Sequence, residues 1–193
     1  HGRFQPLHLG HLEYLLAGAR RCRTLVVGIT NPDPWQVRAE PTAPHRGDDS
    51  ANPFTYYERL LMVEGALRDS GVPDTAFRIV PFPHSFPERL HHYLPADAHI
   101  LLTIYDGWGE EKQRRFRELG RTTEVLWRRD STVTSGTELR RRLRAGQPWE
   151  HLVPAATARV IRTLPAGHPA LLMVDTISSL GSIDFRMDGW KVD

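Results

Sequence analysis

The chain has 193 residues, 40% of them hydrophobic and 25% charged, which is typical of a soluble globular protein with one α/β domain. The net charge of only +2 argues against binding nucleic acid through overall charge, and no apolar run approaches the roughly 18 residues of a transmembrane helix. A single cysteine, Cys22, excludes an internal disulfide framework and agrees with a reducing compartment, so we expect a cytoplasmic protein.

Strand-like and helix-like segments alternate along the chain. Short apolar runs predict strands at residues 24–30, 77–81, 99–105 and 123–127. Apolar periodicity, capping residues and Gly or Pro punctuation predict helices at residues 11–21, 55–70, 110–119, 135–145 and 154–164. This alternation predicts βαβ units and a doubly wound parallel sheet, whose ligands bind beyond the C-terminal strand ends.

The predicted elements form one domain followed by a tail. We expect the domain to span residues 1–164 and the tail to span residues 165–193. The sequence does not start with Met and has no strand before His1, so we expect both of its ends to be trimmed. The sequence leaves the oligomeric state open, and a homo-oligomer is compatible with it.

Two histidines flank a glycine where the first predicted helix begins. His8, Gly10 and His11 belong to the segment G-R-F-Q-P-L-H-L-G-H at residues 2–11. A helix N-terminus attracts anions because it carries free N–H groups and the positive end of the helix dipole. Gly10 lets the backbone approach a ligand, the imidazoles can donate to phosphate oxygens, and Arg3 adds a planar donor. The pattern predicts a phosphate-binding site.

This segment holds no residue with the chemistry of a covalent nucleophile. We therefore expect direct in-line attack of one substrate on the other, with the protein supplying position and charge neutralisation. Loss of one hydrogen-bond donor is expected to cost about 2.7–4 kcal/mol in the transition state. The alternative is that His8 and His11 are surface or helix-start residues without a ligand, but the motif around them favours the phosphate site.

A second candidate phosphate site lies at a later helix start. Residues 134–140, T-S-G-T-E-L-R, combine the hydroxyls of Ser135 and Thr137, backbone access at Gly136 and the guanidinium of Arg140. The alternative is purely structural, because Ser135 begins the spacing of a capping box. Because the chain already has one candidate phosphate site at residues 2–11, we favour phosphate binding for residues 134–140 as well.

Together these segments resemble the nucleotidylyltransferase superfamily with an H-x-G-H motif. Within it, we place the chain nearest to the archaeal-type nicotinamide-nucleotide (NMN) adenylyltransferases. The matching segments are G-R-F-Q-P-x-H-x-G-H (2–11), N-P-F-T-x-x-E-R (52–59), S-G-T-E-x-R (135–140) and L-V-P (152–154). The resemblance implies a Rossmann-like, three-layer α/β/α fold, an NTP bound with Mg²⁺, and release of pyrophosphate.

The resemblance also assigns roles to residues. The residues expected in catalysis are His8, His11 and Arg140. The residues expected to bind the nucleotide are Gly2, Arg3, Phe4, Gln5, Gly10, Thr134, Ser135, Gly136 and Thr137. The residues expected at the acceptor are Arg59, Tyr93, Asp106 and Trp108. Magnesium is expected to be carried mainly by substrate phosphates, without a strong protein metal site.

The acceptor region departs from the adenylyltransferases. In that family a Trp within the segment matching residues 87–94 stacks on the nicotinamide ring, and our alignment places Leu90 there. The family's Gly-Asn-Pro after the next strand is replaced by D-G-W-G at residues 106–109. Trp108 or Tyr93 can take over the stacking. Asp106 lies at a strand end, where it can reach the ribose or the acceptor.

The expected function is transfer of an NMP group from ATP to a phosphate-bearing acceptor such as nicotinamide or nicotinate mononucleotide. One alternative is CTP-dependent transfer to a phosphonate, as in the related cytidylyltransferase-like proteins of phosphonate biosynthesis, which the changed acceptor region fits at least as well. A second alternative is a non-catalytic nucleotide-binding module. His84, His91 and His92 have no standard metal-site spacing, so we expect them to be solvated or to face the acceptor.

The tail resembles class V, serine–glyoxylate-type, aminotransferases at residues 168–181. In that family the aspartate matching Asp175 pairs with the pyridinium nitrogen of pyridoxal phosphate. No Schiff-base lysine follows, since Lys191 lies too near the end, and this argues against an aminotransferase. We expect the stub of a fused or truncated gene, and fusion to a pyridoxal-phosphate-dependent domain is compatible with the sequence. A simple amphipathic tail is the alternative.

Overall fold

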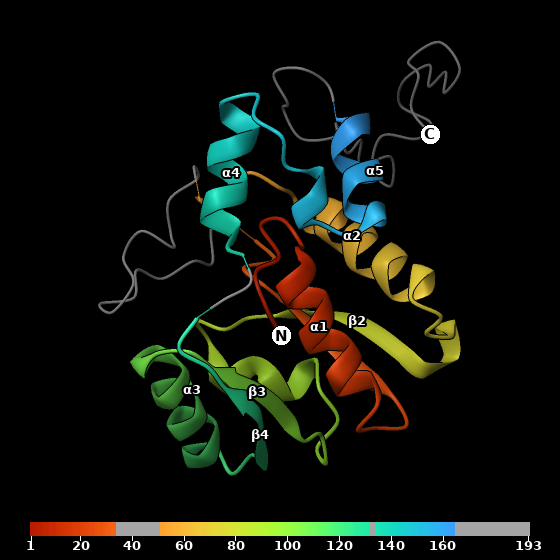
Figure 1. Cartoon of the computed structure of the whole chain (residues 1–193). Coiled ribbons are helices and arrows are strands. Elements are labelled where there is room, and N and C mark those ends of the chain that lie inside the picture. The colour runs from red at the N-terminus through yellow and green to blue at the C-terminus, as the bar shows by residue number, and fades with distance from the viewer. Residues whose placement is uncertain (34–50, 132–133, 165–193) are drawn as a thin grey trace, which may run out of the picture.

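A computed structural model describes residues 1–33, 51–131 and 134–164 (Figure 1). The main elements, in chain order, are α1 (Leu9–Ala19), β1 (Leu25–Thr30), α2 (Tyr56–Asp69), β2 (Phe77–Phe82), β3 (Ile100–Ile104), α3 (Gly107–Glu118), β4 (Thr123–Arg128), α4 (Gly136–Arg144) and α5 (Ala155–Thr163). The short 3-10 helices are η4 (Asp74–Ala76), η5 (Pro87–His92) and η6 (Glu150–Leu152). Helices alternate with parallel strands, so the predicted α/β fold is confirmed. The predicted tail lies outside the described residues.

The strands pair in two parallel sheets of two strands each. Strand β1 pairs with β2 from Leu25↔Phe77 to Thr30↔Phe82, and β3 pairs with β4 with a register shift after Leu102. The sequence predicted one continuous sheet. In the described residues, residues of β1 and β3 instead line a cavity of about 530 Å³. Strands on the two sides of such a space cannot reach the spacing of about 4.8 Å that sheet hydrogen bonds require.

The first residues of the chain pair with the end of β1 at the edge opposite β2. The Gly2 amide donates to the Gly28 carbonyl at 3.0 Å, and the Thr30 amide donates to the Gly2 carbonyl at 2.9 Å. Gly2 thus forms a parallel bridge with Ile29. This pairing fixes the start of the 2–11 segment beside the C-terminal end of β1, where a parallel sheet presents its ligand-binding edge.

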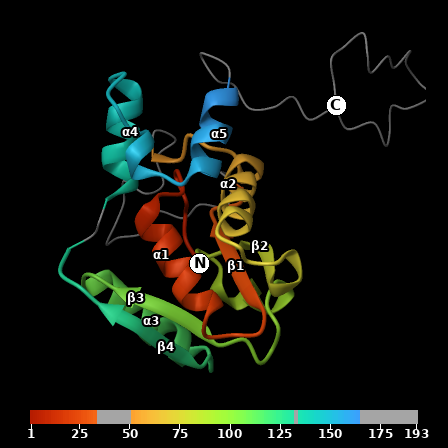
Figure 2. The ribbon, with the colours of Figure 1, turned by 45° about the vertical axis from the view of Figure 1, so that its right-hand side comes forward.

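Two apolar clusters support this edge. The larger packs α1, α2 and α5 around β1 and includes Leu15, Val27 and Met62. Figure 2 shows α2 and α5 side by side, and a Cβ at Gly65 of α2 would lie 2.8 Å from the Ala156 Cβ of α5. The second cluster packs β2, β3 and α3 together through side chains that include Phe82, Leu102 and Phe116.

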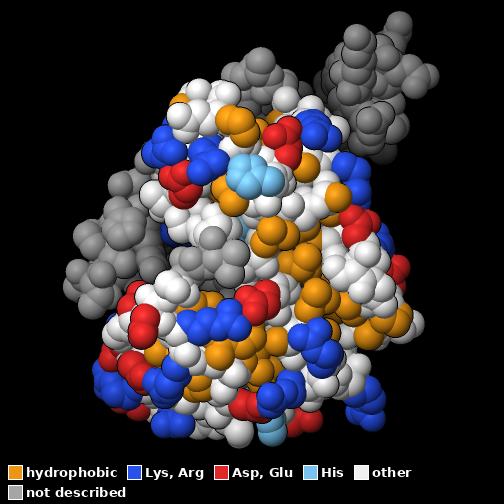
Figure 3. Space-filling view, viewed as in Figure 1, with side chains coloured by type: hydrophobic (Ala, Val, Ile, Leu, Met, Phe, Trp, Pro, Cys, Tyr) orange, Lys and Arg blue, Asp and Glu red, His pale blue; other side chains and the backbone are white. Residues whose placement is uncertain are grey.

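The surface carries charges of both signs. On the face shown in Figure 3, Lys and Arg side chains are interspersed with Asp and Glu, and hydrophobic side chains gather in a band between the upper and lower groups of charges. None of the described helices is long and apolar enough to cross a membrane.

Candidate functional site

His8 forms the N-cap of α1. Its backbone is extended, with φ −131° and ψ 172°, and its Nδ1 accepts a hydrogen bond from the His11 amide at 3.3 Å. The helix therefore begins at Leu9, two residues earlier than the sequence predicted. Because Nδ1 is the acceptor, the neutral ring carries its proton on Nε2, which is then available to donate to a ligand.

The rings of His8 and His11 stack on each other. Their centroids lie 3.6 Å apart at an interplanar angle of 19°, and the edge of His11 meets Phe4 at 5.0 Å. Burial lowers the pKa of His8 to about 4. Burial, and then the neighbouring His8, lowers the pKa of His11 well below its usual value. Both rings are therefore neutral at pH 7, and Nδ1 of His11 is a solvent-inaccessible atom without a hydrogen-bond partner among the described residues.

The turn before α1 is held by buried side chains. We call residues Arg3–Gln5 the motif turn. Phe4 has φ +51° and a fully buried side chain. The Gln5 amide group donates to the Phe54 carbonyl and accepts from the Phe54 amide, both at 2.9 Å. The structure thus places the Phe4 and Gln5 side chains as supports of the turn, and their predicted contacts with a nucleotide stay predictions.

The other predicted nucleotide residues of this segment lie around the same turn. Gly2 pairs with β1, and its Cβ would lie 2.9 Å from the Phe4 ring. Arg3 is half-buried. At Gly10 a Cβ would lie 3.4 Å from the His8 ring, in ordinary van der Waals contact with the imidazole.

The start of α4 meets the motif turn. The buried guanidinium of Arg140 donates to the Gln5 carbonyl at 2.7 Å through Nη1 and to the Thr137 hydroxyl at 3.2 Å through Nη2. A Cβ at Gly136 would lie 3.0 Å from the Gln5 carbonyl oxygen, a close approach that a glycine permits. The structure therefore brings together the two segments in which the sequence predicted phosphate sites.

Only part of the capping box predicted at the start of α4 is formed. The Ser135 hydroxyl accepts from the Glu138 amide at 3.2 Å, as an N-cap does. The Glu138 carboxylate, however, pairs with Arg141 at 2.8 Å and Arg142 at 2.7 Å. Ser135 is exposed, so the ligand contact predicted for it stays sterically open.

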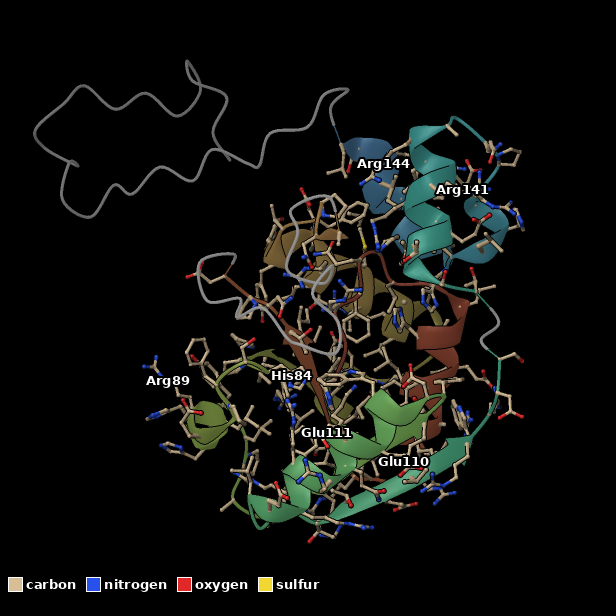
Figure 4. All side chains as sticks on the ribbon, turned by 90° about the vertical axis from the view of Figure 1, so that its left-hand side faces the viewer. His84, Arg89, Glu110, Glu111, Arg141 and Arg144 are labelled. Atoms are coloured by element: carbon tan, nitrogen blue, oxygen red, sulfur yellow. The ribbon has the colours of Figure 1, made fainter. Side chains whose placement is uncertain are left out.

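Thr134 and Thr137 flank this helix start. Thr134 is buried and Thr137 is exposed. Figure 4 shows Arg141 and Arg144 on α4, at the end of the molecule away from His84 and α3.

Arg59 lies under the motif turn. Its side chain belongs to α2 and is 2% exposed, and its guanidinium donates to backbone carbonyls, including that of Arg3 at 3.0 Å. The sequence predicted an acceptor contact for Arg59, whereas these partners are all main-chain atoms of the protein.

Two aromatic side chains meet where β2 and β3 end. His84 follows β2, and Trp108 lies in the first turn of α3, directly after β3. Their ring centroids are 5.6 Å apart at 54°. The Trp108 ring also has Lys112 Nζ at 5.9 Å and the Arg115 guanidinium carbon at 5.2 Å from its centroid. Figure 4 shows His84 inside this region, next to α3, and Arg89 pointing away from it.

The remaining predicted acceptor residues are placed differently. The Asp106 carboxylate caps α3, accepting from the Gly109 amide at 3.0 Å, so α3 begins three residues before its predicted start. Tyr93 is 39% exposed, so the stacking role predicted for it stays a prediction. Leu90 is 2% exposed and packs in the core with Phe82, so it does not stand where a base could stack on it.

The polar groups of the site suit an anion. Imidazoles, guanidinium groups, hydroxyls and the N-termini of α1 and α4 are hydrogen-bond donors. Across residues 1–33, 51–131 and 134–164, no three His, Cys, Asp or Glu side chains lie close enough to hold a metal ion.

Comparison with known proteins defines the class. Residues 1–142 match the family model "Cytidylyltransferase-like", so the chain belongs to this family of nucleotidyltransferases. It is 65% identical over 162 residues to the phosphonoformate cytidylyltransferase of Streptomyces viridochromogenes, a match that covers 84% of this chain and 88% of the relative. The nicotinamide-nucleotide adenylyltransferases of Thermococcus kodakarensis and Methanoculleus marisnigri are 31% and 32% identical, over 84% of this chain and 80% and 88% of theirs.

A solved structure supports the fold. The bifunctional NMN adenylyltransferase/ADP ribose pyrophosphatase from Francisella tularensis matches 83% of this chain with a TM-score of 0.59 and 16% identity. The chain spans 47% of that structure, about half of its length. This likeness confirms the Rossmann-like α/β fold.

These findings confirm one part of the predicted resemblance and correct another. The nucleotidylyltransferase superfamily is confirmed, and the chain is a nucleotidyltransferase. The sequence was placed nearest to the adenylyltransferases, but it is far more similar to a cytidylyltransferase. The relatives named above give no support to the aminotransferase resemblance, and residues 168–181 lie outside the described part of the chain.

Proposed function

We propose that this protein transfers CMP from CTP to a small phosphonate of the phosphonoformate type and releases pyrophosphate. The observation that carries the proposal is the 65% identity to a phosphonoformate cytidylyltransferase over 88% of that protein's length. The adenylyltransferase relatives, at 31% and 32% identity, are much more distant.

The acceptor region supports a small, highly charged acceptor. Leu90, at the position where the resemblance puts a nicotinamide-stacking Trp, is buried in the core. Lys112 and Arg115 lie over the Trp108 ring, so cations compete for the faces on which a nicotinamide ring would stack. Arg115 also pairs with Glu111 at 2.8 Å. The Lys112 and Arg115 side chains beside a half-buried aromatic wall are still compatible with a compact anion such as a carboxylated phosphonate.

The proposed reaction is a single in-line displacement. A phosphonate oxygen attacks the α-phosphorus of CTP while the bond from that phosphorus to the bridging oxygen of pyrophosphate breaks, and the bonding electrons leave with pyrophosphate. The Nε2–H of His8, together with His11 and Arg140, donates hydrogen bonds to the triphosphate and to the charge that grows on the leaving group. The N-termini of α1 and α4 add their dipoles to the same stabilisation.

The donor set also fits the proposed role of Mg²⁺. Because the described residues near the motif turn offer donors and no carboxylate cluster, we propose that phosphate oxygens hold the ion, which would neutralise part of the triphosphate charge when bound. The protein side chains then contribute the remaining positive groups.

Adenylyl transfer from ATP to nicotinamide or nicotinate mononucleotide is the second candidate function. The adenylyltransferase relatives and the Trp108 ring, half-exposed beside His84, favour it. The predicted cytoplasmic location, the absence of nucleic-acid or membrane partners and a homo-oligomer stay predictions.

A pyrophosphate-release assay separates these candidates. CTP and ATP are each combined with phosphonoformate, nicotinamide mononucleotide and nicotinate mononucleotide, with Mg²⁺ present. We expect release with CTP and phosphonoformate. Release only with ATP and a mononucleotide would replace the proposal by the second candidate, and no release with any pair would favour a non-catalytic nucleotide-binding module.

A further inference from the structure

Arg59 has an unusual set of partners for a buried cation. Its Nε donates to the Thr55 carbonyl at 3.0 Å, its Nη1 to the carbonyls of Arg3 at 3.0 Å and Thr30 at 2.7 Å, and its Nη2 to the Asn31 carbonyl at 2.9 Å. These carbonyls belong to the motif turn, the end of β1 and the start of α2. One guanidinium therefore ties three separate chain segments together.

Two residues in the segments that Arg59 ties have left-handed backbone conformations. Phe4, directly after Arg3, has φ +51°, and Asn31 has φ +52°. A phenylalanine rarely adopts this left-handed region and persists there only where its surroundings hold it, whereas an asparagine adopts it more readily. Hydrogen bonds from Arg59 to the carbonyls of Arg3 and Asn31 supply such support at both positions.

The motif turn is held from a second side as well. Gln5 bonds both main-chain groups of Phe54, and Arg140 of α4 donates to the Gln5 carbonyl. Arg59 and Arg140 thus bind carbonyls at the two ends of the motif turn. Arg140 also borders the predicted phosphate site, whereas Arg59 lies beneath the turn and is 2% exposed.

We propose that Arg59 is a positioning residue: it fixes the motif turn in the shape in which His8, His11 and Arg3 meet the triphosphate. This role replaces the direct acceptor contact that the sequence predicted for Arg59, and it rests on nucleotidyl transfer at this site. The residue acts through the backbone and touches neither substrate.

The charge of Arg59 adds to this role. Its guanidinium donates to main-chain carbonyls, and the Glu58 carboxylate on the same helix interacts favourably with its charge. Burial lowers its pKa to about 10, so it stays protonated at pH 7. A positive charge under the motif turn attracts the anionic triphosphate.

The test compares Arg59→Lys with Arg68→Lys. Arg68 lies on the same helix, but it is exposed and pairs with Asp74, so it is the matched control. Lysine keeps the charge and loses the planar fork that reaches several carbonyls at once. Hydrogen–deuterium exchange is followed over residues 1–9 and over the helices. Calorimetry without acceptor measures the nucleotide Kd, and steady-state assays measure kcat and the acceptor KM.

We expect Arg59→Lys to raise amide exchange in residues 3–8 alone and to weaken nucleotide binding about tenfold or more, as loss of hydrogen bonds to a charged group does. A fall of kcat of about 100-fold should accompany a nearly unchanged acceptor KM, because misplaced catalytic donors slow the transfer itself. Arg68→Lys should match the wild-type protein in every measurement. In Arg59→Ala, added guanidinium ion should restore part of kcat, whereas urea should not.

Three outcomes would overturn the proposal. Unchanged exchange in residues 3–8 would show that Arg59 does not hold the turn, whichever nucleotide the protein uses. A change confined to the acceptor KM would restore the direct contact. Increased exchange throughout α2 and β1 in both Arg59 variants, without guanidinium rescue, would reduce Arg59 to a general core residue. If the wild-type protein binds ATP in place of CTP, the proposed substrate fails, and the same measurements with ATP still test the turn.

Discussion

The nucleotide side of the site, residues 2–11 with the start of α4, differs in construction from the acceptor side around His84 and Trp108. On the nucleotide side, buried groups hold the backbone through long-range hydrogen bonds, such as that from Arg140 to the Gln5 carbonyl. On the acceptor side, half-exposed rings and flexible cations contact one another at the ends of β2 and β3. The first region is fixed by main-chain bonds, and the second by side-chain packing.

This difference bears on how such a site can keep one chemistry and change its substrate. Handling a triphosphate requires donors at fixed positions, and here a guanidinium and an amide side chain bind main-chain atoms to set those positions. Recognition of an acceptor requires only a surface of suitable shape and charge. The positions at which this chain departs from the adenylyltransferases, such as Leu90 and Trp108, change that surface and lie outside the motif turn. The following predictions test whether the two sides are separable.

The largest expected effect is on the nucleotide side. Substitution His11→Ala should lower kcat by about 100- to 1000-fold, because one donor to the transition state is lost. The fold should stay intact, as judged by circular dichroism and thermal unfolding. His92→Ala is the control, since His92 is exposed on η5. An unfolded His11→Ala protein would instead mean that the stacked histidine is structural.

The sequence predicted more of this nucleotide side than of the rest. The H-x-G-H segment and residues 134–140 were expected to act together, and Arg140 does donate to the Gln5 carbonyl, close to which Gly136 lies. The α/β alternation also followed from apolar periodicity. The split sheet did not, because periodicity shows which residues form strands but not which strand edges meet.

Helix starts and buried charges were harder to predict. The starts of α1 and α3 were placed too late because their caps, His8 and Asp106, precede glycine-containing turns that resemble loops. The burial of Arg59 had a signal that was missed. It shares the stripe of Met62, Val63 and Ala66, which is the i, i+3, i+4, i+7 spacing of an inward helix face.

A smaller effect is expected where the two phosphate segments meet. In Gly136→Ala, the new Cβ would lie 3.0 Å from the Gln5 carbonyl oxygen and 3.1 Å from Arg140 Nη1. Separating α4 from the motif turn should raise the nucleotide Kd by about tenfold, the effect of one or two lost hydrogen bonds. Gly107→Ala is the matched control, because Gly107 is likewise the first residue of a helix but has open space at its Cβ. Equal Kd values for both variants would contradict a tight junction.

The acceptor side should respond selectively. Trp108→Ala should raise the acceptor KM by about tenfold, since removing an aromatic wall with its cation contacts costs roughly 1–2 kcal/mol. The nucleotide Kd, measured without acceptor, should not change. Trp149→Ala, which removes a ring packed near Leu139, controls for loss of an aromatic side chain. A parallel rise of the nucleotide Kd in Trp108→Ala would show that the two sides are not separable.

The smallest expected effect is a pH dependence of stability that arises on the nucleotide side. His8 has a folded-state pKa of about 4 because it is buried, whereas an unfolded histidine titrates near 6.5. Between these values the unfolded chain binds the extra proton. The contribution of His8 to the free energy of unfolding is therefore complete above about pH 6.5 and falls towards pH 4, by up to about 1.4 kcal/mol per pH unit for one histidine.

Urea unfolding at pH 7, 6, 5 and 4.5 measures this slope. His8→Asn keeps an N-cap side chain and should flatten it, and bound CTP should flatten it too, because the triphosphate favours protonated imidazoles. Glu138, paired with Arg141 and with a pKa of about 2, loses its contribution only at lower pH. An unchanged slope in His8→Asn would mean that His8 is not the group that titrates.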